Sequence, residues 1–373
     1  MTIVRISDEM QWHSVLWASL GVALVYILSK CFYNLFLHPL SGFPGPKLAA
    51  MSNMYEFWYD VVRDGTYIWQ VEKMHQVYGP IVRVNVGELH IRDSEFYSSI
   101  YTSGTRKVNK DPDTYKAFGF PGSTGATIDH DLHRVRRGYM NPYFSKRAIV
   151  EMESLIHERT DRLFRRLEEA ATNGTVVNLN SAFAALTADV ITKRFYGEHF
   201  DFVGEPGFKA VATDAILGLS TVFNVARFFP GAVSAFTNLP RGIVRITVQP
   251  VAALLDFQDD VRAKILSCLK TVEGPQSKSI MASLLNDAHI PAEEKDIGRL
   301  VDDSISFVFG GTESTARTIS TIVFHLLNNK THLKKLREEL DAVLPAQLDQ
   351  HEYSMTQLRH LSYLVCFVPE ALL

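Results

Sequence analysis

Cysteine is scarce in this chain, and neither sign of charge dominates it. The 373 residues include three cysteines, Cys31, Cys268 and Cys366, which lie far apart and in no paired spacing. The sequence therefore indicates no disulfide framework, and no metal site built from protein side chains is expected. The formal net charge is −3 and the basic residues are dispersed apart from one cluster near residue 134, so nucleic acid is not an expected partner.

Internal repeats, low-complexity tracts and a second strand-rich half are also missing. Hydrophobic residues make up 46% of the chain, which is enough to bury a sizeable core. Apolar and polar residues alternate from Ile81 to Ile91, which predicts a β-hairpin. Beyond residue 130 apolar residues recur every three to four positions and predict helices over Ile149–Ala171, Ser181–Tyr196, Pro206–Phe223, Val248–Lys270, Glu293–Asn328 and Thr331–Val343. The expected fold class is mostly α with a small β-sheet, α+β.

The N-terminal region contains one long uncharged run. Residues 10–29 carry no charged side chain, and as a helix they are long enough to cross the hydrocarbon core of a bilayer. A cleaved signal peptide is the competing interpretation, but bulky residues 31–33 follow the run where a cleavage site would need small ones. Acidic residues precede the run and Lys30 follows it, so the positive-inside tendency places the bulk of the chain in the cytosol.

These observations divide the chain into four parts. We expect a luminal tail over residues 1–9, a transmembrane anchor over residues 10–30, a proline-rich hinge over residues 31–50 and a globular domain over residues 51–373. Three prolines between residues 38 and 47 fix the backbone and oppose helix formation, which makes the connector stiff. The expected location is the endoplasmic reticulum membrane, with a single pass.

The longest predicted helix carries two adjacent glycines near its middle. Gly310 and Gly311 each cost about 1 kcal/mol relative to alanine in a helix interior, and Glu313, Ser314 and Thr315 follow them. Glycine lets a ligand approach the backbone, and a hydroxyl that bonds back to the helix can open its hydrogen-bond ladder. One interpretation is a groove in which the acid and hydroxyls hold water and pass protons to a bound group. The alternative is a helix crossing that needs glycine for close packing.

A basic cluster lies upstream of this helix. His133 and Arg137 are four residues apart and fall on one face of a predicted helix. Both can therefore donate to one carboxylate, and the arginine can do so with two parallel hydrogen bonds. The alternative interpretation is a basic helix face in water.

Both segments resemble parts of one family. The Gly-Gly-Thr-Glu-Ser-Thr sequence at residues 310–315 closely resembles the distal-helix motif of the cytochromes P450, and residues 130–145 resemble the helix with which that family holds the haem propionates. The resemblance implies a cytochrome P450-like fold with haem as cofactor. The cofactor-binding residues that it implies are His133, Arg137, Gly310 and Gly311. The catalytic residues that it implies, an acid and two alcohols that deliver protons during oxygen activation, are Glu313, Ser314 and Thr315.

The family holds its haem iron with a cysteine thiolate in a Phe-x-x-Gly-x-Arg-x-Cys-x-Gly loop, and this sequence contains no such loop. We therefore expect residues 51–373 to form a partial haem-monooxygenase domain that lacks the cysteine-ligand region, truncated at its C-terminus. On this expectation haem binding fails and the chain is inactive. Whether it is an enzyme is left undecided by the sequence.

The resemblance also implies a reaction and partners. An intact enzyme would hydroxylate or epoxidise an apolar secondary metabolite, using O₂ and electrons from NADPH-cytochrome P450 reductase. The chain looks like fungal membrane enzymes that oxidise terpenoids such as trichothecene precursors. Basic side chains expected near the surface where the reductase docks are Arg134, Arg136, Lys146 and Arg147. The alternative is a non-catalytic, membrane-anchored pseudoenzyme that serves as a binding or regulatory module.

Overall fold

The structure, a computed structural model, describes most of the chain. The described residues are 2–101, 106–116, 119–209, 223–229, 239–247, 249–270, 279–343 and 354–370, with the single positions 215, 218, 220 and 231. By its internal contacts the chain divides into two compact units, residues 1–108 with 224–230 and residues 109–223 with 231–373. Most of the helix predicted over Pro206–Phe223 lies outside the described residues.

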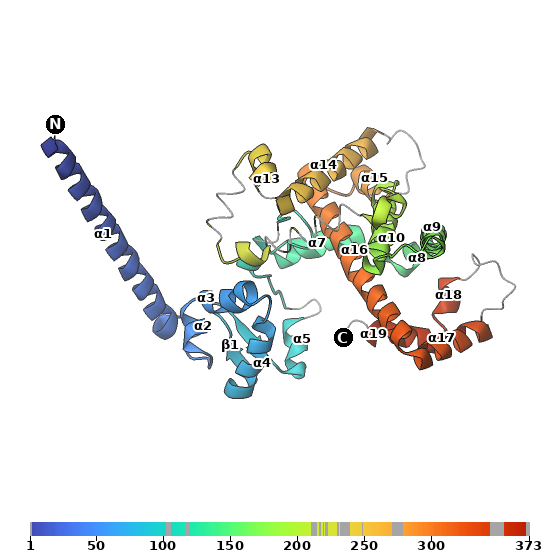
Figure 1. The fold of residues 1–373 in the computed structure, drawn as a ribbon, viewed down its shortest axis with the longest axis horizontal. Helices are drawn as coiled ribbons and strands as arrows, with labels where there is room; N and C mark the ends of the chain where they lie inside the picture. The colour runs from blue at the N-terminus through green and yellow to red at the C-terminus, as the bar shows by residue number, and fades with distance from the viewer. Residues whose placement is uncertain are drawn as a thin grey trace. The chain divides into compact units, whose positions relative to one another are not determined.

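The first unit begins with a long helix. Helix α1, Thr2–Phe32, continues into a π-helical turn, η1, Tyr33–Leu37 (Figure 1). Among the described residues one segment, Trp12–Leu37, is long and apolar enough to cross a membrane, and its most apolar stretch is entirely uncovered. An uncovered apolar helix is consistent with the predicted anchor. It ends at Leu37, beyond the boundary expected at residue 30.

Short helices and one hairpin complete the first unit. Its remaining elements are α2 (Lys47–Met51), α3 (Met54–Phe57), η2 (Trp58–Val62), α4 (Tyr67–Tyr78), β1 (Ile81–Arg83), β2 (Leu89–Ile91), η3 (Ser94–Phe96) and α5 (Tyr97–Ile100). Strands β1 and β2 pair antiparallel with Val82 opposite His90, which confirms the predicted hairpin. A small core of Tyr67, Val71 and Met74 packs against Val82.

The connector between α1 and the hairpin is held at several points. The Asn34 side chain donates to the Met51 carbonyl at 2.9 Å, and Arg83 Nη1 donates to the Asn34 carbonyl at 2.8 Å. The Arg83 backbone N–H donates to the Pro44 carbonyl at 2.8 Å. A Cβ at Gly45 would collide with the Arg83 carbonyl, so this position requires glycine. The proline-rich residues are therefore bound to the first strand.

Within the described part of the second unit, every regular element is a helix. Its elements are α6 (Pro112–Lys116), α7 (His130–Met140), η4 (Asn141–Phe144), α8 (Lys146–Val150), α9 (Glu153–Thr172), α10 (Leu179–Tyr196), η5 (Phe202–Gly204), η6 (Pro206–Phe208), α13 (Arg241–Thr247), α14 (Gln249–Lys270), α15 (Ile280–Asn286), η7 (Ala292–Lys295), α16 (Ile297–Asn328), α17 (Lys330–Val343), α18 (Met355–Leu358) and α19 (Ser362–Glu370). Helices α10, α14, α16 and α17 confirm predicted ones, whereas the helix predicted over Ile149–Ala171 is divided between α8 and α9.

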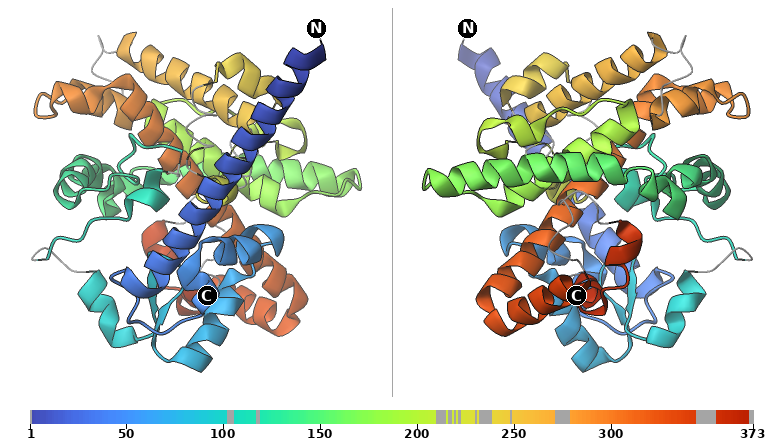
Figure 2. Two further views of the ribbon diagram at one scale, coloured as in Figure 1. Left: turned by 90° about the vertical axis from the view of Figure 1, so that its left-hand side faces the viewer. Right: turned by 90° about the vertical axis from the view of Figure 1, so that its right-hand side faces the viewer.

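Helix α16 is the central element of this unit. Its buried residues recur at helical spacing and form one face: Val301, Ile305, Val308, Thr312 and Ala316. It packs most extensively on α10 and next on α14 (Figures 1 and 2). The helix begins four residues later than predicted, because Asp296 has an extended backbone and caps it by accepting from the Arg299 N–H at 2.9 Å.

Candidate functional site

The two glycines of α16 have different surroundings. Gly311 faces α10, where an added Cβ would lie 3.4 Å from Ile191 Cγ1, an ordinary contact distance. Gly310 is exposed, and apart from its chain neighbours and the backbone of its own helix no described atom lies within 4 Å of the place its Cβ would take. Close helix packing therefore accounts for Gly311 at most. It gives no structural reason for Gly310, which costs the helix stability.

Hydroxyl side chains bond back to the α16 backbone just after the glycines. Ser314 Oγ donates to the Gly310 carbonyl at 2.5 Å, and Thr318 Oγ1 donates to the Ser314 carbonyl at 2.9 Å. Ser314 and Thr315 are both exposed. Since the Ser314 proton is used inside the helix, its oxygen presents lone pairs outward as hydrogen-bond acceptors. Gly310 and Ser314 thus form one open, polar turn of the helix.

Two buried polar atoms beside this turn have no hydrogen-bond partner among the described residues. They are Glu313 Oε2 and Thr312 Oγ1. Thr312 is fully buried against α10, where Thr187 Oγ1 lies 3.2 Å from the Thr312 carbonyl. An unsatisfied buried polar atom costs about 1–3 kcal/mol, so a water or ligand group that bonded to Glu313 would stabilise the site.

An aromatic wall precedes the glycines. The Phe309 ring stacks on Phe257 of α14 with 5.9 Å between centroids and meets Phe120 edge-on at 5.6 Å. Phe120 and Phe257 are buried in the main core cluster, and Phe309 is partly buried against it. The polar turn of α16 therefore directly follows an apolar surface.

Helix α7 carries the second predicted group. Asp129 caps it by accepting from the Leu132 N–H at 2.8 Å, and His133 and Arg137 lie one turn apart, half-buried and exposed respectively. Burial lowers the pKa of His133, and the charges of Lys110, Arg137 and His130 lower it further. Neither His133 nor Arg137 has a carboxylate partner within the described parts of the chain.

Lys110 extends this group into a cluster of cations. Burial lowers its pKa, and the Arg137 charge lowers it further. Its Nζ donates to the Gly125 carbonyl at 2.5 Å. Sequence reasoning missed Lys110, because a lysine in a loop has no periodicity that would place it beside α7. Cations held together without a described counter-charge suit a ligand that brings its own carboxylates, as a haem does.

Arg136 corrects one sequence expectation. It was predicted on an exposed docking surface, but its side chain is 14% exposed and pairs with Glu294, Nε to Oε2 at 2.9 Å and Nη2 to Oε1 at 3.1 Å. The prediction was wrong for this residue, because a run of basic residues does not show which one turns toward a distant carboxylate. Arg147, with its side chain 90% exposed, does lie at the surface.

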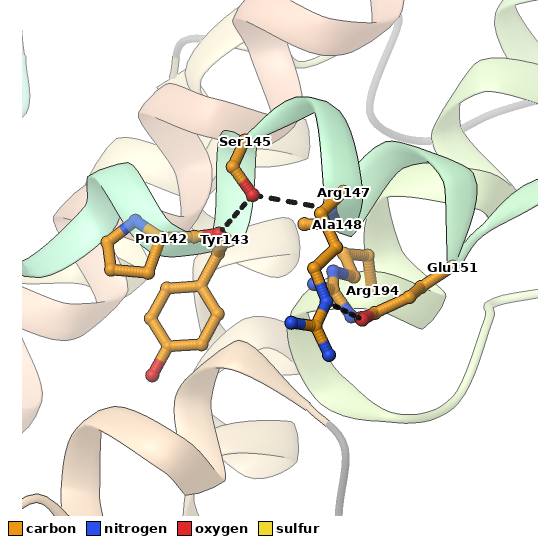
Figure 3. A pocket seen from close by; sticks show the side chains of 7 residues that line it. All are labelled: Pro142, Tyr143, Ser145, Arg147, Ala148, Glu151 and Arg194. Carbon is orange, nitrogen blue, oxygen red and sulfur yellow. Dashed lines mark hydrogen bonds and ion pairs between the residues drawn. The ribbon is translucent and has the colours of Figure 1, made fainter.

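An open hollow lies beyond the end of α7 (Figure 3). It measures about 600 Å³ and is lined by Pro142, Tyr143, Ser145, Arg147, Ala148, Glu151 and Arg194. Ser145 caps α8 by accepting from the Ala148 N–H at 3.3 Å, and Arg147 pairs with Glu151 at 3.2 Å. No predicted site residue lines this hollow, so the candidate site consists of the α16 turn and the α7 cations.

The buried cysteine of α14 does not have the surroundings of a metal-ligating thiolate. Cys268 is buried in α14 with its Sγ 3.5 Å from the Tyr196 carbonyl, and burial raises the pKa of its thiol. A ligand needs the opposite, a stabilised thiolate. Cys31 lies in α1 and Cys366 in α19. The described residues therefore fit the carboxylate end of a haem, whereas the surroundings of Cys268 do not favour a thiolate.

Comparison with known proteins gives one consistent result. The family model named "Cytochrome P450" matches residues 44–372. The chain is 47% identical over 356 residues to the cytochrome P450 monooxygenase TRI4 of Trichoderma arundinaceum, covering 95% of this chain and 68% of the relative. It is 46% identical over 350 residues to the cytochrome P450 monooxygenase SAT11 of Stachybotrys chartarum, covering 94% and 66%.

A third relative agrees. The conidiogenone synthase PchP450 of Penicillium rubens is 41% identical over 316 residues, covering 85% of this chain and 64% of the relative. The chain thus spans about two thirds of the length of these relatives. The match covers most of the chain, and the residues matched include both α7 and α16. The chain belongs to the cytochrome P450 family.

Proposed function

We propose that the protein to which this sequence belongs is a haem-dependent monooxygenase that hydroxylates or epoxidises an apolar secondary metabolite of the terpenoid class. The observation that carries the proposal is the exposed turn at Gly310, where the helix accepts a destabilising residue that no packing contact requires. Family membership and relatives described as monooxygenases support it. The aromatic wall at Phe309 supports an apolar substrate.

Each predicted residue has a role in this proposal. His133 and Arg137 would hold the haem carboxylates, and Gly310 and Gly311 would leave room for the ring beside α16. A bound haem supplies the activation of O₂. Glu313 would hold a water through its unpaired oxygen, and Ser314 and Thr315 would accept and pass protons at the open turn.

Partners and location follow from the same proposal. Electrons would come from an NADPH-dependent cytochrome P450 reductase, which would dock on exposed basic side chains such as Arg147. The apolar α1 would anchor the protein in the endoplasmic reticulum membrane with the two units in the cytosol. The anchor, the proline-rich connector and the haem domain remain proposed with the boundaries given above.

Oxygen transfer in microsomes tests the proposal. The full-length protein that contains this sequence is expressed with a reductase, supplied with terpenoid substrates and ¹⁸O₂, and the products are analysed by mass spectrometry. A product that carries one ¹⁸O atom and depends on the chain supports the function. The matched variant Glu313→Gln keeps the size of the side chain and should lower product formed per NADPH consumed, because it cannot transfer a proton. An unchanged ratio would contradict the role of Glu313.

A second candidate function is a non-catalytic binding module on the same fold. The aromatic wall at Phe309 is the observation that favours it, because an apolar surface of this kind can bind a ligand without haem. The carbon monoxide difference spectrum of reduced microsomes separates the two candidates. A Soret band in the position of thiolate-bound haem excludes the module, whereas apolar ligand binding with no haem band and no oxygenated product supports it.

A further inference from the structure

A series of buried ion pairs joins α7 to the start of α16. Arg136 of α7 pairs with Glu294 at 2.9 Å, Glu294 pairs with Arg299 Nε at 3.2 Å, and Arg299 Nη1 pairs with Asp303 at 2.6 Å. Arg136 Nη1 also donates to Thr127 Oγ1 at 2.9 Å. The four charged side chains are 14%, 13%, 10% and 1% exposed in that order. Positive and negative side chains alternate, so the net charge of the series is zero.

The same series holds the loop that precedes α7. Asp303 Oδ1 accepts from the Thr124 N–H at 2.5 Å, and Asp302 Oδ2 accepts from the Gly122 N–H at 2.9 Å. A Cβ at Gly122 would lie 2.9 Å from Asp302 Oδ2 and 3.2 Å from the Arg299 backbone, so the loop lies directly on α16. Helix α7 is thus fixed through Arg136 itself and through the loop that leads into it.

The bond to Arg136 sets the rotation of α7 about its own axis. Successive residues of a helix are about 100° apart, so an inward Arg136 leaves Arg137 on a different face. His133 lies one turn before Arg137 and shares that face. If α7 turned by one residue position, Arg137 would take the inward place, and His133 and Arg137 would together turn away from the place where the cofactor carboxylates would bind.

We propose that Arg136 is a positioning residue: its ion pair with Glu294 locks the rotation of α7, and this keeps His133 and Arg137 directed together at the carboxylates of the cofactor. The inference rests on the proposed function, because it assigns a purpose to the cations of α7. An ion pair that only stabilised the fold would not affect how the protein distinguishes a ligand with free carboxylates from one without them.

Two ligands that differ only in their carboxylates test this directly. Hemin and hemin dimethyl ester are titrated into the full-length protein that contains this sequence, in lipid nanodiscs, and the ratio of their dissociation constants is measured by absorbance. The wild-type protein should bind hemin about tenfold more tightly, as expected for hydrogen bonds to the carboxylates from the His133 ring and the charged Arg137 guanidinium. Glu294→Gln should reduce this ratio to about one, because Arg136 loses its charged partner.

A surface ion pair supplies the control. Arg147 and Glu151 form a pair of the same chemistry with side chains 90% and 55% exposed, so Glu151→Gln should leave the ratio unchanged. If Glu294→Gln lowers the melting temperature but retains the wild-type ratio, the ion pair is structural only and the inference is wrong. If the wild-type chain itself shows no preference for hemin, the proposed role of the α7 cations fails, and this inference fails with it.

A milder variant covers the case in which Glu294→Gln does not fold. Arg136→Lys keeps the positive charge but cannot make the two parallel hydrogen bonds of a guanidinium. It should lower the hemin preference by about threefold while circular dichroism shows the wild-type helix content. A wild-type ratio in this folded variant would overturn the inference.

Discussion

Replacing Gly310 by alanine should stabilise this protein and impair its ligand binding at the same time. Alanine is favoured over glycine inside a helix by about 1 kcal/mol, and the new methyl group would have no described atom within 4 Å other than those of its chain neighbours and its own helix backbone. The expected gain is therefore the full propensity difference, about 1 kcal/mol. For a unit of this size that corresponds to a rise in melting temperature of about 2–4 °C.

Urea unfolding of the chain in detergent micelles, followed by circular dichroism, measures the gain. Gly138→Ala is the matched control, because Gly138 lies in α7 and also has no described atom within 4 Å of its Cβ position. Both variants should be stabilised, but only Gly310→Ala should weaken hemin binding, by about tenfold for a contact worth 1.4 kcal/mol. Loss of stability in Gly310→Ala would show that the fold needs this glycine. Stabilisation with unchanged hemin affinity would refute its assignment to the ligand site.

Three further predictions concern other residues. Hemin carboxylates should raise the pKa of His133, which burial and neighbouring cations lower in the free protein. Hemin affinity should therefore strengthen as pH falls from the raised pKa of the complex toward the lowered pKa of the free protein, and this slope should vanish in His133→Phe. Gly45→Ala should destabilise the first unit by about 1–3 kcal/mol in urea unfolding, because its methyl group meets the Arg83 carbonyl. Thr187→Val should lower the free energy of unfolding by about 1 kcal/mol, because the variant loses the hydroxyl hydrogen bonds of Thr187, among them the one to the Thr312 carbonyl. Thermal unfolding that matched wild type would show that these hydrogen bonds do not contribute to stability.

Periodicity predicted most of the regular structure. The hairpin over Ile81–Ile91 and the helices that became α10, α14, α16 and α17 follow from apolar spacing, because burial of one face requires that spacing. Helix ends were less predictable. The start of α16 depends on the capping geometry of Asp296, and two residues between Val150 and Glu153 separate helices that the pattern joined.

The candidate site was predictable in composition and less so in geometry. Two adjacent glycines look alike in the sequence, and only the position of α10 shows that Gly311 meets a neighbour and Gly310 does not. Arg136 and Arg137 are likewise adjacent and identical, and the distant Glu294 decides which one is buried. Tertiary contacts of this kind leave no periodic signal in the chain. The truncation and the inactivity expected from the sequence stay predictions.

The hydrogen bonds just beyond the C-terminal end of α1 determine where a form of the protein without this helix can begin. A form that starts at residue 38 removes the Asn34 carbonyl, one of two carbonyls that accept from the Arg83 guanidinium, which is 1% exposed. That guanidinium would then lack part of the bonding that makes its burial tolerable. A form that starts at residue 33 keeps the bond but retains Phe36 and Leu37, which are 64% and 63% exposed. A starting residue chosen from hydropathy alone would therefore lie inside the folded part of the protein.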